Sequence, residues 1–139
     1  MKMLKRTLLA ISLASFTQVS LAAVVMIGNP ATADQLTKKQ AQSIYLAKSK
    51  KLPSGASVVI NELSPGDPIR SEFHEKVTGK SDAQLKSYWS RLVFTGKAAA
   101  PAEHGSATAL KAAVASTPGA VGYIDEADVD GSVAVLFKP

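Results

Sequence analysis

The residues with the clearest chemical potential lie in a turn that leads into a helix, between Ser64 and Arg70. Asp67 followed by Pro68 predicts a helix start, because aspartate caps a first turn and proline fits the first helical position. The backbone N–H groups of a first turn have no partner inside the helix and carry a partial positive charge, so they attract anions. We therefore expect a small oxyanion to bind at this turn, with backbone amides from Gly66 to Arg70 as donors.

Other side chains with catalytic chemistry form no recognised constellation. His74 and His104 are the two histidines, and a Ser–His–Asp set can be drawn from His104, Asp67 and either Ser64 or Ser106. No G-x-S-x-G or related motif fixes a nucleophile, so the sequence predicts a protein that is not an enzyme. His74 is expected to be partly exposed, with a structural role.

Metal chemistry has equally little support in the sequence. The acidic run from Asp125 to Asp130 lacks the residue order of a calcium-binding loop, which predicts a solvated turn instead. The chain contains no cysteine, and this excludes disulfides and thiolate metal sites. We expect neither a metal nor a cofactor.

Residues 1–22 have the pattern of a secretory signal peptide. Lys2, Lys5 and Arg6 precede a short apolar run, and small residues follow at 20 and 22, where a signal peptidase reads the chain. The apolar run is too short and too interrupted for a transmembrane span of about 20 residues. We expect cleavage after residue 22 or 23, export to the periplasm, and no membrane span in the mature protein.

Removal of this peptide changes the charge balance. The whole chain has 16 basic and 11 acidic residues, but three of the basic residues leave with the signal, so the mature net charge is about +2. A charge this small predicts no nucleic-acid partner, which would require a basic stripe. Residues 23–139 fit one domain with a core of its own.

The rest of the chain alternates apolar runs with amphipathic segments, which predicts an α/β fold with a mostly parallel sheet flanked by helices. We expect the first strand to be buried on both faces as parallel strands are, and the last two strands to form an antiparallel hairpin. The apolar stripe of the third helix, from Leu85 to Val93, is expected to be core. Strands are expected at 24–27, 57–60, 120–124 and 132–137, and helices at 37–50, 67–78, 81–95 and 106–116.

Three segments resemble the phosphate-binding proteins of ABC transporters. Residues 36–48, with LT at 36–37 and IYLAK at 44–48, look like the family's "Ls-x-x-q…IF-x-Gk" segment. Residues 88–97, with YW followed by FTGK, look like "yW…FsG", and residues 118–124 (PGAVGYI) look like "pGaIGYv". The last match is the most specific, and the order and spacing agree over nearly the whole mature chain. The chain is most similar to short, single-lobe periplasmic proteins of this class.

The resemblance implies one lobe of a periplasmic-binding-protein-like fold, in which full-length members hold the anion between two lobes. In the phosphate binders a Ser-Gly-Thr at a helix start, with an arginine a few residues earlier, donates hydrogen bonds to the oxyanion. Asp67, Pro68 and Ile69 stand about where these residues would, and they offer no hydroxyl, one amide fewer and a negative charge that repels phosphate. The candidate ligand-binding residues are Ser64, Gly66, Asp67, Ile69, Arg70 and Ser106.

Two functions of different classes follow from these observations. The first is an exported, non-enzymatic solute-binding-like protein that binds phosphate or another small oxyanion for an ABC transporter, with a permease or a second protein lobe as its partner. The second is a periplasmic interaction module that keeps the lobe fold but has lost its ligand. The second predicts an exposed apolar patch, because monomers rarely leave large ones uncovered.

Overall fold

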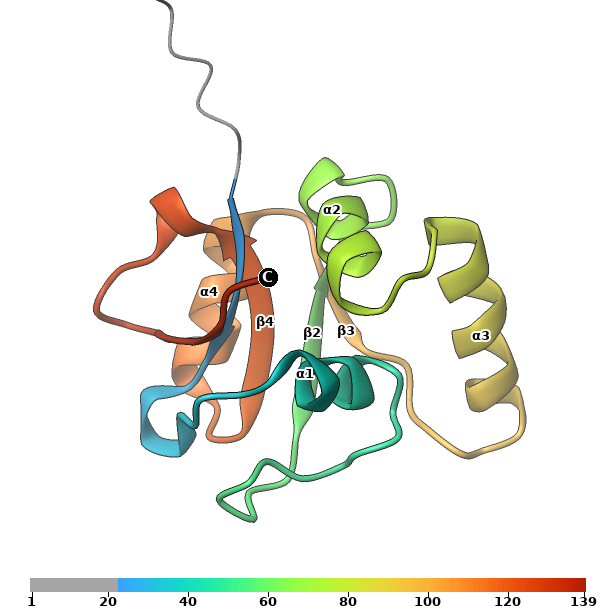
Figure 1. Ribbon diagram of the computed structural model, residues 1–139, viewed down its shortest axis with the longest axis horizontal. Helices are drawn as coiled ribbons and strands as arrows, with labels where there is room; N and C mark the ends of the chain where they lie inside the picture. The colour runs from blue at the N-terminus through green and yellow to red at the C-terminus, as the bar shows by residue number, and fades with distance from the viewer. Residues whose placement is uncertain (1–22) are drawn as a thin grey trace, which may run out of the picture.

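A computed structural model describes residues 23–139, and the expected signal peptide lies outside this range. The elements follow one another as strand β1 (Val24–Gly28), the 3-10 turn η1 (Pro30–Thr32), helix α1 (Lys38–Tyr45), strand β2 (Val59–Leu63), helices α2 (Pro68–Val77) and α3 (Asp82–Phe94), strand β3 (Ala102–His104), helix α4 (Ala107–Ser116), strand β4 (Ala120–Asp125), the 3-10 turn η2 (Glu126–Asp128) and strand β5 (Ala134–Phe137). Figure 1 shows their arrangement. The α/β class is confirmed.

The five strands form one sheet in the order β3-β2-β4-β1-β5. Strand β2 pairs in parallel with both β3 and β4, whereas β1 pairs antiparallel with β4 and with β5. Four of the five strands therefore run in one direction, which confirms a mostly parallel sheet.

Two details of the expected topology are wrong. The first strand is the antiparallel one, and the last two strands form no hairpin because β1 lies between them. The sequence of β1 was misleading since a continuous apolar run records burial on both faces and carries no information on strand direction. Strand β3 was missed: its three residues fall in a segment that we expected to be a loop.

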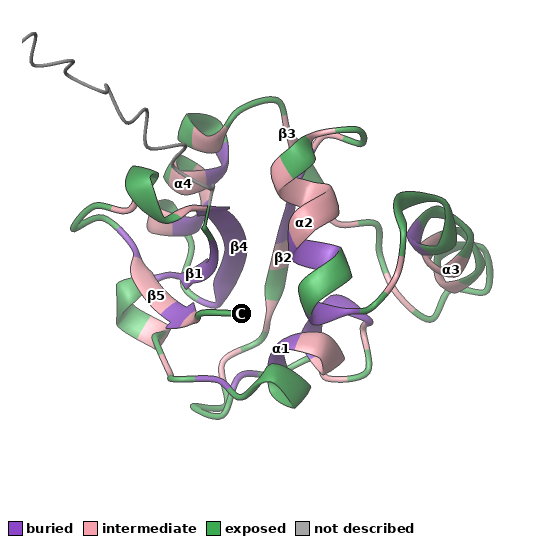
Figure 2. Cartoon of the chain, turned by 45° about the horizontal axis from the view of Figure 1, so that its top comes forward, coloured by how far each residue is buried: buried purple, intermediate pink, exposed green. Residues whose placement is uncertain are grey.

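Helices cover both faces of the sheet, as neighbouring residues of β4 show. The ring of Tyr123 stacks on Phe73 of α2 with the two centroids 4.3 Å apart. Gly122, which faces the other way, lies under Leu110 and Val114 of α4, where a Cβ would come within 2.5 Å of a leucine methyl. Because successive strand residues point to opposite faces, α2 and α4 pack on opposite sides of the sheet. Figure 2 shows the buried strands between them.

Side chains cap the starts of the helices. Thr37 and Ser81 each accept a hydrogen bond from the backbone amide three residues on, and the glutamine at that position returns one to the cap amide. These reciprocal capping boxes satisfy two of the amides that a helix leaves unpaired. The cap of α2 is Asp67, as expected, and the cap of α4 is Ser106.

Helix α3 departs from its expected role. The apolar stripe that we assigned to the core has one buried member, Leu85, while the side chain of Phe94 is 91% exposed. The helix lies at one side of the molecule, beyond β3 and away from the sheet (Figure 1). Its other ties to the domain include two polar contacts: the Tyr88 hydroxyl donates to the Leu46 carbonyl over 2.6 Å, and Asp82 accepts from the Ser71 hydroxyl over 2.8 Å. Periodicity identified an apolar face correctly, but it did not reveal that little of the chain packs against that face.

Between residues 23 and 139, no helix is both long and apolar enough to cross a membrane.

Candidate functional site

The predicted ligand turn lies at the edge of the sheet where parallel strands end. Leu63, the last residue of β2, is opposite His104, the last residue of β3, and the Ser64 amide donates to the His104 carbonyl over 3.0 Å. Helix α2 begins after Asp67 and α4 begins after Ser106, so both helix starts follow this edge. In open α/β sheets the carboxyl edge of the strands is where ligands usually bind.

The side chains of the turn are already engaged with the chain itself. The Asp67 carboxylate accepts a hydrogen bond from the Ile69 amide over 2.9 Å, and the Ser64 hydroxyl donates to the His104 carbonyl over 3.2 Å. Gly66 has a φ of +88°, which lets the chain turn before the helix. The carboxylate of Asp67 therefore occupies an amide position at the helix start that a bound oxyanion would use.

Arg70 is turned back toward the sheet and away from the helix start. Its NH1 group donates to the Leu63 carbonyl over 2.7 Å. Its Nε lies 3.5 Å from the Glu62 carboxylate and its NH1 lies 3.5 Å from that of Glu103, with 14% of the side chain exposed. The guanidinium is thus held by two carboxylates and a carbonyl, which lowers its capacity to bind an anion.

Ser106 and Ile69 have structural contacts at the same edge. The Ser106 hydroxyl accepts from the Ala109 amide over 3.1 Å and caps α4. Ile69 is partly buried and packs against the hydrophobic core. The structure therefore brings the six predicted residues to one edge of the sheet, but each of the polar side chains among them has an internal partner.

Beneath the turn lies a buried polar cluster that the sequence analysis missed. The Nε2 of His74 lies 2.9 Å from both carboxylate oxygens of Glu62, and the Tyr123 hydroxyl donates to the same carboxylate over 2.6 Å while it accepts from the Leu63 amide. His74 is 1% exposed and Glu62 is 3% exposed. The expectation that His74 is partly exposed is wrong, because its helix packs that face onto β2.

A second set of polar contacts extends the cluster along β2. The His104 Nε2 lies 2.9 Å from the Asn61 side-chain oxygen, the Asn61 amide group donates to the Val121 carbonyl, and the Tyr45 hydroxyl donates to the Asn61 carbonyl. His104 is paired with asparagine, so the Ser–His–Asp set that could be drawn on paper is not assembled. One sequence signal pointed to this cluster: Asn61 and Glu62 are polar residues inside a strand that is otherwise apolar.

The acidic turn after β4 is solvated, as expected. Asp130 pairs with Lys111 over 2.8 Å and accepts from the Ser132 amide, and these hydrogen bonds hold the pKa of Asp130 below its usual range. Asp125 accepts from the Ala127 amide and caps η2. Within residues 23–139, no three acidic or histidine side chains come together in a way that could hold a metal ion.

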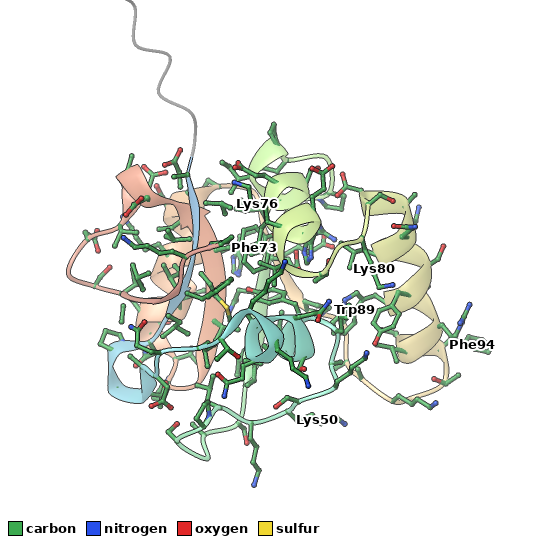
Figure 3. The ribbon with its side chains drawn as sticks, in the orientation of Figure 1. Lys50, Phe73, Lys76, Lys80, Trp89 and Phe94 are labelled. Carbon is green, nitrogen blue, oxygen red and sulfur yellow. The ribbon has the colours of Figure 1, made fainter. Side chains whose placement is uncertain are left out.

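A pocket of about 710 Å³ opens between α3, the start of α2 and the segment before β3. Glu62, Arg70 and Glu103 are at its polar end, next to the candidate turn, and Pro65 of that turn also lines it. The opposite wall is the apolar face of α3, including Trp89. Figure 3 shows Trp89 on the side of α3 that faces the rest of the domain, with Phe94 at the far end of the helix.

No known family model matches the chain, and no curated protein is detectably similar in sequence. Solved structures, in contrast, match well. An ABC-type phosphate transport receptor from Vibrio cholerae superposes with a TM-score of 0.63 at 20% identity, covering 83% of this chain and 45% of the receptor. A Clostridium perfringens protein assigned as a phosphate ABC transporter substrate-binding protein, solved with bound phosphate, gives 0.65 at 21% identity, with 83% and 44% covered. PstS from Borrelia burgdorferi gives 0.58 at 14% identity.

The chain has the fold of one lobe of a phosphate transport receptor. This confirms the family resemblance at the level of the fold. The chain spans less than half the length of the solved structures that it matches, so the likeness covers one part of those proteins.

The buried tyrosines of the lobe predict a loss of stability at alkaline pH. Burial, and then the negative charge of Glu62, raise the pKa of Tyr123 and of Tyr45 above the usual value. Above about pH 10 the unfolded chain loses these protons while the folded chain keeps them, so the free energy of unfolding falls by about 1.4 kcal/mol per pH unit for each tyrosine. Urea unfolding between about pH 9 and about pH 11 measures this slope.

Tyr123→Phe is the matched variant for that measurement. It removes one of the two tyrosines with a raised pKa, so the fall in the free energy of unfolding per pH unit should be about half as steep. At neutral pH the free energy of unfolding should drop by about 1–3 kcal/mol, because the Leu63 amide and Glu62 each lose a partner. An unfolding free energy that stays constant between about pH 9 and about pH 11 in the unmodified protein would contradict the prediction.

Proposed function

We propose that this chain is an exported, non-enzymatic solute-binding-like protein that serves an ABC transporter and binds phosphate or another small oxyanion. The observation that carries the proposal is the meeting of two helix starts, at Asp67 and Ser106, on the carboxyl edge of a lobe that shares its fold with phosphate receptors. The proposal includes export through a cleaved signal peptide at residues 1–22, which would put the protein in the periplasm.

The proposed ligand competes with the chain for the same donors. An oxyanion at the start of α2 takes the Ile69 amide from the Asp67 carboxylate, and it gains the Ser64 hydroxyl if that group leaves the His104 carbonyl. Repulsion between Asp67 and the ligand lowers the affinity, so we expect weak binding by the isolated chain. A second lobe, from a transporter subunit or another protein, supplies the missing wall of the site.

Calorimetric titration of the mature protein with phosphate and with sulfate tests the proposal. Heat that saturates at millimolar phosphate supports it, and the phosphate-to-sulfate ratio identifies the preferred ion. An absence of heat with both ions, in a sample whose circular dichroism shows a folded α/β protein, would remove oxyanion binding from the function of the isolated chain.

A second candidate function is supported by a separate observation. Phe94 and Val93 at the end of α3 are exposed apolar side chains beside a groove, as an interaction module requires. On this alternative the chain keeps the lobe fold to present that surface and binds no oxyanion. Sedimentation of the mature protein with and without a Phe94→Asp substitution discriminates the two: self-association that the substitution abolishes favours the interaction module, and a monomer in both samples disfavours it.

A further inference from the structure

The pocket beside α3 has the properties of an organic ligand site. Its volume of about 710 Å³ lies within the range of about 300–1,000 Å³ typical of small-molecule pockets. Such pockets are lined mainly by apolar and aromatic side chains with a few polar groups that fix orientation. Here Leu85, Trp89, Val93 and Pro101 form apolar walls.

Trp89 presents an apolar surface to this pocket. Its indole nitrogen is buried and has no hydrogen-bond partner among residues 23–139, so no ligand reaches the N–H without a movement of the ring. The rest of the half-buried ring is what a ligand can touch. The face of an indole attracts both apolar groups and cations, since the ring carries negative charge density above its plane.

The accessible charge at the polar end is a carboxylate. Glu103 has 51% of its side chain exposed, and it accepts no hydrogen bond from the part of the chain that the structure describes, with Arg70 as its nearest cation at 3.5 Å. Arg70 is 14% exposed and is already bonded to the Leu63 carbonyl. A ligand that enters from solvent therefore meets Glu103 before it meets the guanidinium.

The remaining polar and charged groups of the lining add no accessible net charge to the polar end of the pocket. Glu62 is buried and satisfied by His74 and Tyr123. At the rim, Asp82 and Lys86 are one helical turn apart with opposite charges, and Ser90 is neutral. Apart from the satisfied Glu62, the lining holds two carboxylates and two cations, so the exposed Glu103 decides which ligand charge the polar end favours.

We propose that this pocket binds an organic cation with an apolar or aromatic body, whose ammonium or guanidinium group pairs with Glu103 and whose body lies against Trp89. The pocket adjoins the candidate turn, but Ile69, whose amide is the proposed oxyanion donor, is not in its lining, so this ligand goes beyond the function proposed above. Arg70 acts in it as a positioning residue, because its contact with Glu103 holds that carboxylate at the mouth of the pocket.

The sole tryptophan of the chain reports on this pocket directly. Titration of the mature protein with 2-phenylethylammonium should shift and quench the Trp89 emission in a saturable way. 3-Phenylpropionate, which carries a carboxylate on the same phenylethyl body, should bind at least fivefold more weakly, and 2-phenylethanol should fall between the two.

Glu103→Gln should weaken 2-phenylethylammonium about fivefold and leave 2-phenylethanol unchanged, because the substitution removes the charge and keeps the shape. Glu75→Gln is the matched control, since Glu75 is an exposed carboxylate on α2 that lies outside the pocket lining. It should leave all three affinities unchanged.

Three results would overturn the proposal: emission that no probe changes, 3-phenylpropionate binding as tightly as the amine, or equal effects of the two substitutions. A calorimetric titration with phosphate distinguishes a failure of this pocket proposal from a failure of the proposed oxyanion-binding function. Phosphate binding without amine binding leaves the oxyanion site standing, whereas amine binding without phosphate heat leaves this pocket standing.

Discussion

Asp67→Asn should raise the affinity of the mature protein for phosphate at least tenfold. Asparagine caps a helix as well as aspartate does, so the hydrogen bond from the Ile69 amide and the start of α2 are preserved. The substitution removes the negative charge beside the proposed oxyanion. Two like charges about 4 Å apart near a protein surface repel by about 4 kcal/mol at an effective dielectric constant near 20, and a part of that energy suffices for a tenfold gain.

Calorimetric titrations of the variant and the unmodified protein, run side by side, measure this gain. Asp34→Asn is the matched control: Asp34 precedes α1, and its carboxylate also accepts from a backbone amide, that of Ser54 on the segment that leads into the opposite end of β2. Asp67→Ser, which adds a hydroxyl at the cap, should bind phosphate at least as well as Asp67→Asn. If neither Asp67 variant binds better than the unmodified chain, the oxyanion site is lost and the interaction module becomes the better function.

His74→Leu should lower the free energy of unfolding by about 1–3 kcal/mol, because the buried Glu62 carboxylate loses a hydrogen-bond partner and gains none in its place. The Glu62 carboxylate would keep the Tyr123 hydroxyl and the Arg70 Nε at 3.5 Å, but it would lose its contact with the His74 ring. Leucine is apolar and of similar bulk, so packing losses are kept small. Urea unfolding followed by circular dichroism gives the change.

Lys76→Leu is the matched control for this prediction. It lies on the same helix and breaks an exposed pair with Glu72, so it should change the free energy of unfolding by less than about 0.5 kcal/mol. The double variant Glu62→Leu with His74→Leu should recover most of the loss, because an apolar pair needs no charge compensation. A loss below about 1 kcal/mol for His74→Leu would mean that the buried pair contributes little.

The position of the candidate site could be predicted from the sequence, but the internal contacts of its side chains could not. The Asp67-Pro68 helix start was readable from local residue types, and a helix that follows a strand of a mostly parallel sheet begins at the carboxyl edge of that sheet. The engagement of Arg70 was not readable, because Glu62 and Glu103 reach it from two strands that are far apart in sequence. The polar cluster under the turn was missed for the same reason.

The pocket beside α3 shows a different limit of sequence reasoning. Leu85, Trp89 and Val93 follow a helical period, and that pattern states only that one face of the helix is apolar. It does not state whether another element covers the face. Here the segment that leads from α3 to β3 runs beside the helix and leaves a pocket between them.

The sequence by itself determined the α/β class, the helix starts and their caps, the absence of cysteine chemistry and the resemblance to a receptor lobe. The helix starts and caps depend on residues within one turn of each other, and the other features follow from composition or from local patterns repeated along the chain. Only the tertiary structure decided the direction of β1, the burial of His74 against Glu62, the internal partners of Arg70 and the open face of α3. Each of these depends on contacts between different secondary-structure elements, and local propensity carries no information about such contacts.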